Sequence, residues 1–435
     1  MEATRFRTMR SSIDLSSHSG LALLGELFRA VDFKKTVDKV HLLRRPEPEL
    51  RHGDVLGTMT ALLFLGKPDY DAVKAFHDDT LLRKAMGLSR VPSSETLRNR
   101  LNLADGRFDD VIRELSGTLV RRFGKPTACY DQYVPLDIDV SPFDNSGSNK
   151  EGVSCTYAKV DGYAPIMAYI GTEGYLANLE LREGKAHSQH GGEHFLDESI
   201  RLAQRMTDAP LLVRMDSGHD AIDNLKVCSE RKVSWIIKRN LRRTPPATWL
   251  EIAKRFGTRC DSRPGKIVYR GELTVKRDKI PLRIVFETIE RTTDKYGQYL
   301  IQPEIDSNTW WASTEFDVDT VIKLYHDHAT SEQFHSELKT DMDLERLPSG
   351  KFATNALILL LGMFAYNALR LIGQHSLQFP APHRKQTERR RIRSVLQDLV
   401  YMACQIVTHA RKWFLQFGRN NRWRPTWQGI HATFS

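Results

Sequence analysis

One stretch of the chain carries four polar side chains at spacings of three, four and seven positions: Tyr325, His328, Glu332 and Lys339. An α-helix turns once in about 3.6 residues, so these spacings predict that the four side chains stack along one helix face. Phe334 and Leu338 would lie on the opposite face, where a core would take them. A phenol, an imidazole, a carboxylate and a cation in one row favour a site for a metal ion and a phosphate. A solvated charged face is the alternative.

Two further acids can complete such a site. Transfer or hydrolysis of a phosphodiester needs an activated nucleophile and a stabilised oxyanion, and two Mg²⁺ ions about 3.5–4 Å apart supply both. Mg²⁺ prefers carboxylate oxygens. Asp139 and Asp216 belong to two predicted strands and Glu332 to a predicted helix, so the three are candidate metal ligands. Asp137 lies two residues before Asp139 on the same strand face and is the alternative first acid.

The segments around these acids alternate between strand and helix patterns. Residues 134–140 alternate apolar and other side chains, and residues 210–215 form an apolar run that ends at Asp216 and Gly218. Further strands are expected at 156–170, 175–181 and 233–238, and helices at 194–206, 220–231, 318–339 and 355–372. This order predicts a mixed α/β sheet, in which acids near strand ends lie where such sheets place their chemistry.

The N-terminal part of the chain shows helical spacing of apolar residues over 21–33, 53–65, 69–76 and 107–123. The segment from Pro92 begins like a capped helix, with serine before it and Glu95 in its first turn. Together with a helix at 81–86 and the turn at Gly87, it resembles a helix-turn-helix recognition element. Arg98 and Arg100 are therefore candidate DNA contacts, unless this is an ordinary capped surface helix.

Residues 241–316 read as a β-rich insertion, since 266–275 and 281–290 alternate like hairpin strands. Trp310 near its end is a candidate for stacking on a base, with core packing as the alternative. The tail from Thr387 to Phe417 is expected to form one or two basic amphipathic helices. The chain thus divides into a helical DNA-binding region (1–127), a core in two parts (128–240 and 317–375), the insertion (241–316) and a basic helical C-terminal region (376–435).

The charge of the chain favours a polyanionic partner. The formal net charge is +10 and the pI is about 9.3. Residues 238–283 hold 14 Lys and Arg against 4 acids, and residues 383–425 hold 11 against 2, so the remainder of the chain is acidic. Two basic segments beside an acidic body are typical of nucleic-acid surfaces, although a basic surface without a ligand is also possible.

Other classes of protein fit poorly. Five scattered cysteines without a Cys-x-x-Cys pair argue against a zinc ribbon or a disulfide framework and favour a reducing cytoplasm. No signal peptide opens the chain, and the apolar run 356–366 is too short to span a bilayer and reads as a buried helix. His187, His190 and His194 have few acidic or thiol neighbours, which favours a polar loop near DNA over a metal site.

The motifs together resemble a known family. Asp139-x-Ser, Arg214-x-Asp216-Ser-Gly218 and Tyr325-x₂-His328-x₃-Glu332-x₆-Lys339 look like those of DDE transposases of bacterial insertion sequences. The resemblance is closest to the branch with a Tyr–Arg–Glu–Lys signature and, within it, to insertion-sequence group thirteen-eighty. One position departs from the pattern, because His328 stands where the family has arginine and lacks the guanidinium fork for phosphate.

The resemblance implies an RNase H-like catalytic domain with a β-rich insertion between the second and third acids, which are Asp216 and Glu332. It favours Asp139 over Asp137 as the first acid. The implied protein is a cytoplasmic, nucleoid-associated transposase that depends on Mg²⁺, with Mn²⁺ as a substitute. It would bind terminal inverted repeats, cut them and join them to target DNA, as a homodimer when DNA-bound and without membrane contact. The alternatives are a catalytically silent DNA-binding regulator and a purely hydrolytic nuclease of the same fold.

Overall fold

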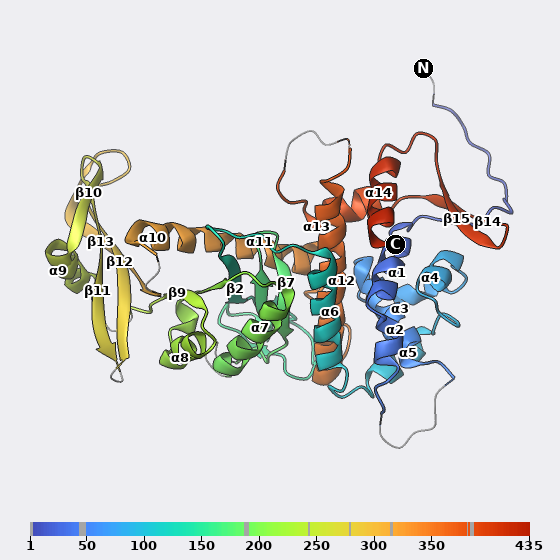
Figure 1. Ribbon diagram of the computed structural model, residues 1–435, viewed down its shortest axis with the longest axis horizontal. Coiled ribbons are helices and arrows are strands. Elements are labelled where there is room, and N and C mark those ends of the chain that lie inside the picture. Colours follow the sequence, from blue (N-terminus) through green and yellow to red (C-terminus); the bar gives the residue numbers. More distant parts are fainter. Residues whose placement is uncertain are drawn as a thin grey trace.

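A computed structural model gives the fold of residues 3–42, 49–186, 191–241, 244–277, 280–313, 316–380, 382 and 387–435. The molecule is elongated (Figure 1), with a β-rich segment at one end and a mixed sheet in the middle. The N-terminal helices and a C-terminal hairpin occupy the other end.

The described strands β10-β11-β12-β13-β9-β8-β2-β6-β7 form one sheet in this order. Their bounds are β2 (Val134–Val140), β6 (Ile166–Ile170), β7 (Tyr175–Glu180), β8 (Leu211–Met215), β9 (Ser234–Lys238), β10 (Gly257–Arg263), β11 (Lys266–Arg277), β12 (Ile280–Thr293) and β13 (Tyr299–Ala312). The pairs β2–β8 and β8–β9 are parallel, and the remaining pairs are antiparallel. The predicted mixed α/β sheet is therefore confirmed.

Helices cover the middle of this sheet. They are α6 (Asp109–Phe123), α7 (Gly192–Met206), η2 (Ser217–His219), α8 (Ile222–Glu230) and α12 (Phe352–Ser376). The helix α7 packs on β7 and β2, and α12 packs against β7 and α6. By length and composition α12 could cross a membrane, but 94% of its most apolar window is buried inside the protein. It behaves as the buried core helix that the apolar run predicted.

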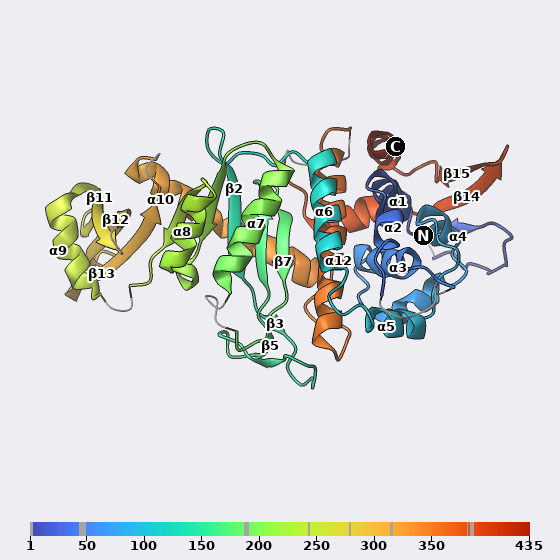
Figure 2. The same cartoon turned by 60° about the horizontal axis from the view of Figure 1, so that its bottom comes forward.

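A small sheet follows β2 directly. Its strands β3 (Phe143–Asp144), β4 (Ser154–Cys155) and β5 (Asp161–Tyr163) pair in the order β3-β5-β4. Figure 2 shows this sheet below the end of the main sheet. The turn between β4 and β5 carries Tyr157, which becomes important at the site.

The β-rich end contains one helix that the sequence pattern did not predict, α9 (Pro246–Phe256). Pro246 occupies the first turn of this helix, where a missing backbone N–H costs nothing. Trp249, Leu250 and Ala253 form its buried face, and the helix packs on β11, β12 and β13. Pro245 and Pro246 thus begin a helix at this point of the β-rich segment.

The N-terminal region is helical, as predicted. Its elements are α1 (Gly20–Ala30), α2 (Phe33–Val37), α3 (His52–Phe64), the 3-10 helix η1 (Tyr70–Phe76), α4 (Thr80–Ala85) and α5 (Ser94–Leu101). The predicted cap of α5 is confirmed, since the Ser93 hydroxyl accepts a hydrogen bond from the Thr96 amide at 3.2 Å.

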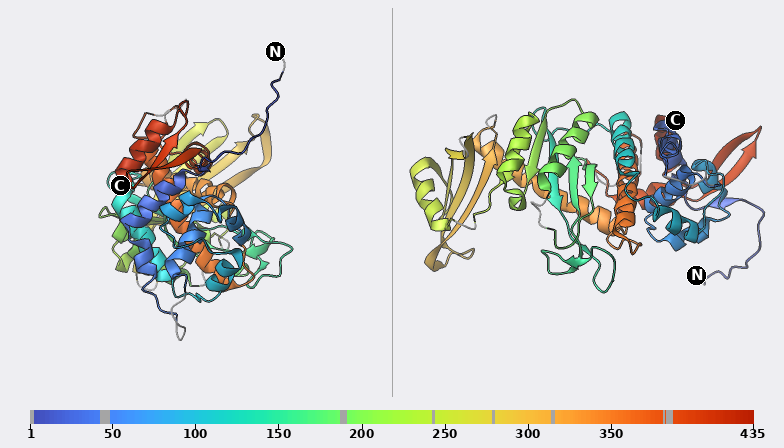
Figure 3. Two further views of the ribbon diagram at one scale, coloured as in Figure 1. Left: turned by 90° about the vertical axis from the view of Figure 1, so that its right-hand side faces the viewer. Right: turned by 90° about the horizontal axis from the view of Figure 1, so that it is seen from below.

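The expectation of helices throughout 387–417 is wrong for its second half. After α13 (Ile392–Val395) and the π-helix η5 (Leu396–Val400), the chain forms a hairpin of β14 (Cys404–His409) and β15 (Lys412–Phe417), and then α14 (Arg424–Phe434). Ala410 and Arg411 both have positive φ, which allows a two-residue turn, and β1 (Leu15–Ser16) adds a third strand. Figure 3 shows this hairpin projecting at the end opposite to β10–β13.

The predicted helix from Val318 is present, but its winding changes three times. It consists of α10 (Val318–His326), the 3-10 helix η3 (Asp327–Thr330), α11 (Ser331–Ser336) and the π-helix η4 (Glu337–Asp341). Phe334 and Leu338 are buried, as their spacing predicted. Because a 3-10 turn overwinds the chain and a π-turn underwinds it, the four polar side chains do not keep a common face.

Candidate active site

Asp139 and Asp216 lie at the carboxyl ends of two neighbouring parallel strands. In the register of β2 and β8, Ile138 pairs with Met215, and each aspartate is the next residue in its chain. Asp216 begins η2, where its Oδ1 accepts a hydrogen bond from the Gly218 amide at 3.0 Å. Parallel strands bring their carboxyl ends to one sheet edge, so two carboxylates that are far apart in the sequence share one site.

Asp139 is held by two hydrogen bonds and still faces solvent. Its side chain is 24% exposed, its Oδ1 accepts from the Val140 amide at 2.7 Å, and its Oδ2 lies 3.2 Å from His335 Nε2. Burial would raise the pKa of Asp139, but the contact with His335, the charge of His328 and the Val140 amide together lower it. The carboxylate is therefore ionised and its orientation is fixed.

Asp137, the alternative first acid, is part of a buried ion cluster. Arg214 donates two hydrogen bonds to its carboxylate, at 2.6 and 2.7 Å, and His328 Nδ1 lies 3.0 Å away. Burial opposes the charge, but Arg214 and His328 together lower the pKa of Asp137 to about 2. Since both of its oxygens are engaged and its side chain is 4% exposed, Asp137 has no open coordination site in this conformation.

Arg214 also connects the sheet to α10, because its Nη1 donates a hydrogen bond to the Leu324 carbonyl at 2.7 Å. His328 takes part in the same cluster and is 6% exposed. The side chain at this position, where the resemblance implied an arginine, points inward at Asp137.

Two tyrosines flank the aspartate pair. Burial and then the charges of Asp216 and Asp139 raise the pKa of Tyr325. Burial and the same two charges raise the pKa of Tyr157 to about 12. The Tyr157 hydroxyl donates to the Val140 carbonyl at 2.9 Å, next to Asp139, while the residue is 68% exposed. An exposed phenol ring therefore lies beside the two carboxylates.

Glu332, the predicted third acid, lies apart from this pair. It is solvent exposed on α11 and makes no hydrogen bond or ion pair with the part of the chain that the structure describes. It precedes His335 by three residues, and residues at this spacing are neighbours on a helix surface. Glu332 is thus one turn away from the imidazole that contacts Asp139, with its carboxylate free to rotate.

Lys339 contacts the segment that follows β2. Its ammonium donates to the Pro142 carbonyl and lies 5.6 Å from the centre of the Phe143 ring. Burial lowers the pKa of Lys339, and the charges of Glu345 and Asp139 oppose this change. The cation is therefore within electrostatic reach of Asp139, immediately beyond the end of β2.

The remaining candidates lie away from the aspartates or inside the core. Trp310 is 1% exposed and packs 5.6 Å from the Tyr325 ring, so in this conformation it adopts the core packing that the sequence left open. Arg98 is exposed on α5 and lies over the Tyr70 ring at 5.4 Å. Arg100 is half-buried and donates to the Leu50 carbonyl at 2.8 Å. His187 and His190 lie outside the described residues.

Within the described residues, no group of three or more His, Cys, Asp and Glu side chains is assembled to hold a metal ion. Asp139 and Asp216 nevertheless suit Mg²⁺, which binds through one or two carboxylates and completes its octahedron with water and substrate phosphate. The Asp216 side chain is 48% exposed, so this pair is open to such a ligand. Glu332 is not grouped with these two carboxylates in this conformation.

Sequence reasoning missed two residues of this site. His335 had no signal, because its contact with Asp139 depends on how α11 packs across β2. Its Nδ1 lies 3.2 Å from the Tyr169 hydroxyl, so the imidazole is held from both sides. Tyr157 lies in a turn between very short strands, where hydropathy patterns carry no information.

Comparison with known proteins identifies the family. Residues 5–433 match the family model described as Transposase DDE domain group 1. No curated protein matches the chain. Among solved structures, the cryo-EM structure of the piggyBac transposase synaptic complex with hairpin DNA is similar at 13% identity and a TM-score of 0.41. That alignment covers 89% of this chain and 82% of the other, and the likeness is too loose to define this fold. Because the family model spans nearly the whole chain and the site lies within it, the protein belongs to the transposase DDE domain group 1 family.

Proposed function

We propose that the protein is a bacterial insertion-sequence transposase of the branch with a Tyr–Arg–Glu–Lys signature, closest to group thirteen-eighty. It binds the terminal inverted repeats of its element, cuts the DNA strands and joins the freed ends to target DNA. The observation that carries this proposal is the pair of ionisable side chains at the ends of β2 and β8, Asp139 and Asp216, with Tyr325 and Tyr157 beside them.

The sheet supports an RNase H-like core as the resemblance implied. The strands β7, β6, β2, β8 and β9 pair in that order, antiparallel up to β2 and parallel beyond it. The segment from α9 to β13 extends the same sheet between the second acid and α10, which is where the β-rich insertion was expected. In this proposal Asp139, Asp216 and Glu332 hold Mg²⁺ or Mn²⁺, and Tyr325 and Lys339 position the end phosphate.

A bound metal would activate the attacking water or hydroxyl and stabilise charge on the phosphate oxygens. The chain's own residues orient the site. His335 fixes one oxygen of Asp139, and the Gly218 amide fixes one oxygen of Asp216. The proposed partners are double-stranded DNA and, when DNA is bound, a second copy of the chain, because joining requires two ends. The proposed setting is the bacterial cytoplasm.

The test is cleavage of a supercoiled plasmid that carries the element's ends, in Mg²⁺ and in Mn²⁺. We expect Asp139→Asn, Asp216→Asn and Glu332→Gln each to lower cleavage by about 100-fold or more, with DNA binding retained. Glu304→Gln, an exposed acid on β13, is the matched control and should cleave like the wild type. Full cleavage by Glu332→Gln would remove Glu332 from the site.

Two observations favour a second candidate, a DNA-binding regulator without catalysis. Glu332 does not contact the two aspartates, and His328 replaces the phosphate-binding arginine of the family. A wild-type protein that binds the ends but never cuts them, in either metal, would establish this alternative. A protein that cuts but yields no strand-transfer product would instead be a hydrolytic nuclease.

A further inference from the structure

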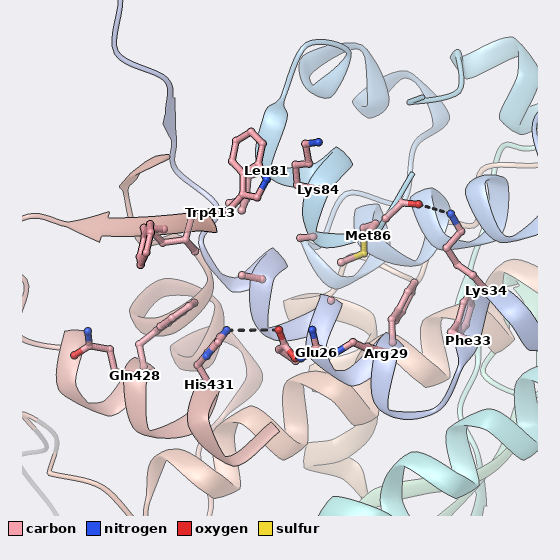
Figure 4. Close-up of a pocket in the computed structure, with 18 of the residues that line it drawn as sticks. Glu26, Arg29, Phe33, Lys34, Leu81, Lys84, Met86, Trp413, Gln428 and His431 are labelled. Atoms are coloured by element: carbon pink, nitrogen blue, oxygen red, sulfur yellow. Dashed lines mark hydrogen bonds and ion pairs between the residues drawn. The ribbon is translucent and has the colours of Figure 1, made fainter. Parts of the chain in front are cut away.

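A groove far from the aspartates separates the N-terminal helices from the C-terminal hairpin. It has a volume of about 860 Å³ and is lined by residues of α1, α2, α4, β15 and α14. Figure 4 shows Trp413 and Lys84 at one side and His431 paired with Glu26 at the other. A groove of this size is within the range of small-molecule sites.

The groove presents aromatic side chains to solvent. Trp413 is 51% exposed and Phe414 is 45% exposed, whereas Trp249, Trp310, Trp311 and Trp427 are all buried. The Lys84 ammonium lies 4.8 Å from the centre of the Trp413 ring. A large exposed ring beside a cation is a stacking platform for an aromatic, negatively charged ligand.

A buried donor on the same groove has no partner. Trp427 is 4% exposed and lines the groove, yet its indole Nε1–H makes no hydrogen bond with any described residue. Its ring is fixed by stacking on His431 at 5.3 Å and by Phe417 at 4.8 Å. Because buried donors are almost always paired, this N–H is suited to an acceptor on a ligand.

The charges around the groove favour an anion. Its lining includes Arg29, Lys34, Lys35 and Lys84 against Glu26 and Asp32. Arg29 pairs with Glu26 and Lys34 with Asp54, while Lys35 and Lys84 have no acid partner among the described residues. Exposed arginines of the N-terminal segment, Arg5, Arg7 and Arg10, reach the same end of the molecule, because β1 pairs with β14.

We propose that this groove binds an unpaired nucleotide of a DNA strand. The base stacks on Trp413, the phosphates pair with Lys84 and Lys35, and an acceptor of the nucleotide receives the Trp427 N–H. A nucleotide unites the three properties that the groove offers, since it has a flat ring, hydrogen-bond acceptors and a negative charge. The choice of DNA as the polymer rests on the proposed function, whereas the nucleotide chemistry rests on the groove alone.

The experiment measures the affinity of the full chain for a fluorescent oligo-thymidylate by anisotropy, in buffer without divalent metal. We expect Trp413→Ala and Lys84→Ala each to weaken binding by about tenfold, as loss of one base–aromatic contact does. Trp427→Phe keeps the ring, removes the N–H and should weaken binding by about threefold. The control is Arg201→Ala with Arg205→Ala, two cations that are paired with Glu114 away from the groove, which should bind normally.

Three results would overturn the proposal. The first is unchanged affinity of Trp413→Ala, which is at an exposed position and should fold. The second is that the same substitutions weaken binding of a fully paired duplex as much as they weaken binding of the oligo-thymidylate, because stacking needs an unpaired base. The third is competition by free thymidine monophosphate as strong as by the oligonucleotide, which would assign the groove to free nucleotides. Since no cleavage is measured, failure of the proposed transposase activity in the plasmid assay would leave this result standing.

Discussion

At the scale of single residues, neighbouring acids on one strand have separate tasks. Asp137 and Asp139 share a face of β2, but Asp137 is enclosed by Arg214 and His328, whereas Asp139 touches His335 and opens to solvent. The sequence favoured Asp139 only through the Ser141 that follows it. The pairing of Asp137 with Arg214 could not be predicted, because Arg214 belongs to a strand far along the sequence. The motif around Arg214 does not indicate which acid it pairs with.

Asp137→Asn should lower the stability of the fold and leave the metal-binding pair in place. Removing one partner of a buried ion pair costs about 3–5 kcal/mol, which urea unfolding at pH 7 would measure. Asp139→Asn, at a more exposed site, should cost less than about 1 kcal/mol and abolish cleavage instead. The reverse pattern would make Asp137 the first catalytic acid.

The carboxylate of Asp137 also predicts how the free energy of unfolding depends on pH. The pKa of Asp137 is about 2 in the folded chain, below its ordinary value near 3.9, so folding favours the ionised form. Its contribution of about 2 kcal/mol is fully present above pH 4 and is lost as the pH falls toward 2. Unfolding free energies measured between pH 5 and 2 should decline less steeply for Asp137→Asn than for the wild type. Parallel curves would contradict the assignment.

Tyr157 is an exposed aromatic residue of the site. Tyr157→Ala should lower kcat/KM for cleavage by about tenfold without changing the melting temperature, because its ring is exposed beside both aspartates. Tyr157→Phe keeps the ring and should show a smaller loss. Tyr299→Ala, 88% exposed on β13, is the control. Equal activity of wild type and Tyr157→Ala would exclude a substrate contact.

At the scale of elements, ion pairs with distant segments determine the winding of the helical segment from α10 to η4. The π-helix η4 places Glu337 and Asp341 inward, and the Met342 amide bonds the Glu337 carbonyl at 3.1 Å. Arg370 and Arg389 pair with Glu337, and Arg391 donates to Asp341 at 2.8 and 3.1 Å. The basic segment that contains Arg389 and Arg391 was expected to belong to a nucleic-acid surface, yet both arginines pair with acids of η4.

The local sequence pattern predicted the boundaries of most core elements. The elements that it predicted wrongly share one physical cause, which is their dependence on partners far away in the sequence. The strand 134–140 and the helices 220–231 and 355–372 alternate or repeat so regularly that few alternatives exist. The 3-10 and π turns around Glu332, the helix α9 and the hairpin β14–β15 depend on partners elsewhere in the chain. A straight helix from 318 to 339 was therefore the best local prediction, and it misplaced Tyr325, His328, Glu332 and Lys339 relative to one another.

Arg389→Ala should loosen the turn that holds Lys339. Its guanidinium also donates to the Gln333 side chain at 2.9 Å and lies over Phe334 at 4.8 Å, so one cation contacts both α11 and the start of η4. We expect a stability loss of about 2 kcal/mol, since Arg370 still compensates Glu337, and a fall in kcat greater than any rise in KM. Arg389→Lys should recover part of the rate. Arg419→Ala, an exposed cation, is the control, and a change in KM alone would reject this positioning role.

At the scale of the whole molecule, exposed cations gather at the two ends while the aspartates lie between them. Lys276 and Arg277 end β11 at the β-rich end, and Arg411 and Lys412 form the turn of the hairpin at the other end. In Figure 1, the strands β2 and β7 and the helices α6, α7 and α8 lie between these two ends. An elongated body with cationic tips suits a long polyanion that runs past the central site.

Neutralising either tip should therefore reduce the salt dependence of DNA binding. Each phosphate contact contributes about 0.9 to the slope of log K against log salt, so Lys276→Ala with Arg277→Ala should lower the slope by about 2, and Arg411→Ala with Lys412→Ala by a similar amount. Arg201 and Arg205 are paired with Glu114 on α6, and their double alanine variant should leave the slope unchanged. Affinities for one terminal-repeat duplex, measured from about 50 to 300 mM salt, give the slopes. If only one tip lowers the slope, DNA passes over that end alone; if neither does, the cations at the tips serve solubility and the duplex is bound along the flank of the sheet.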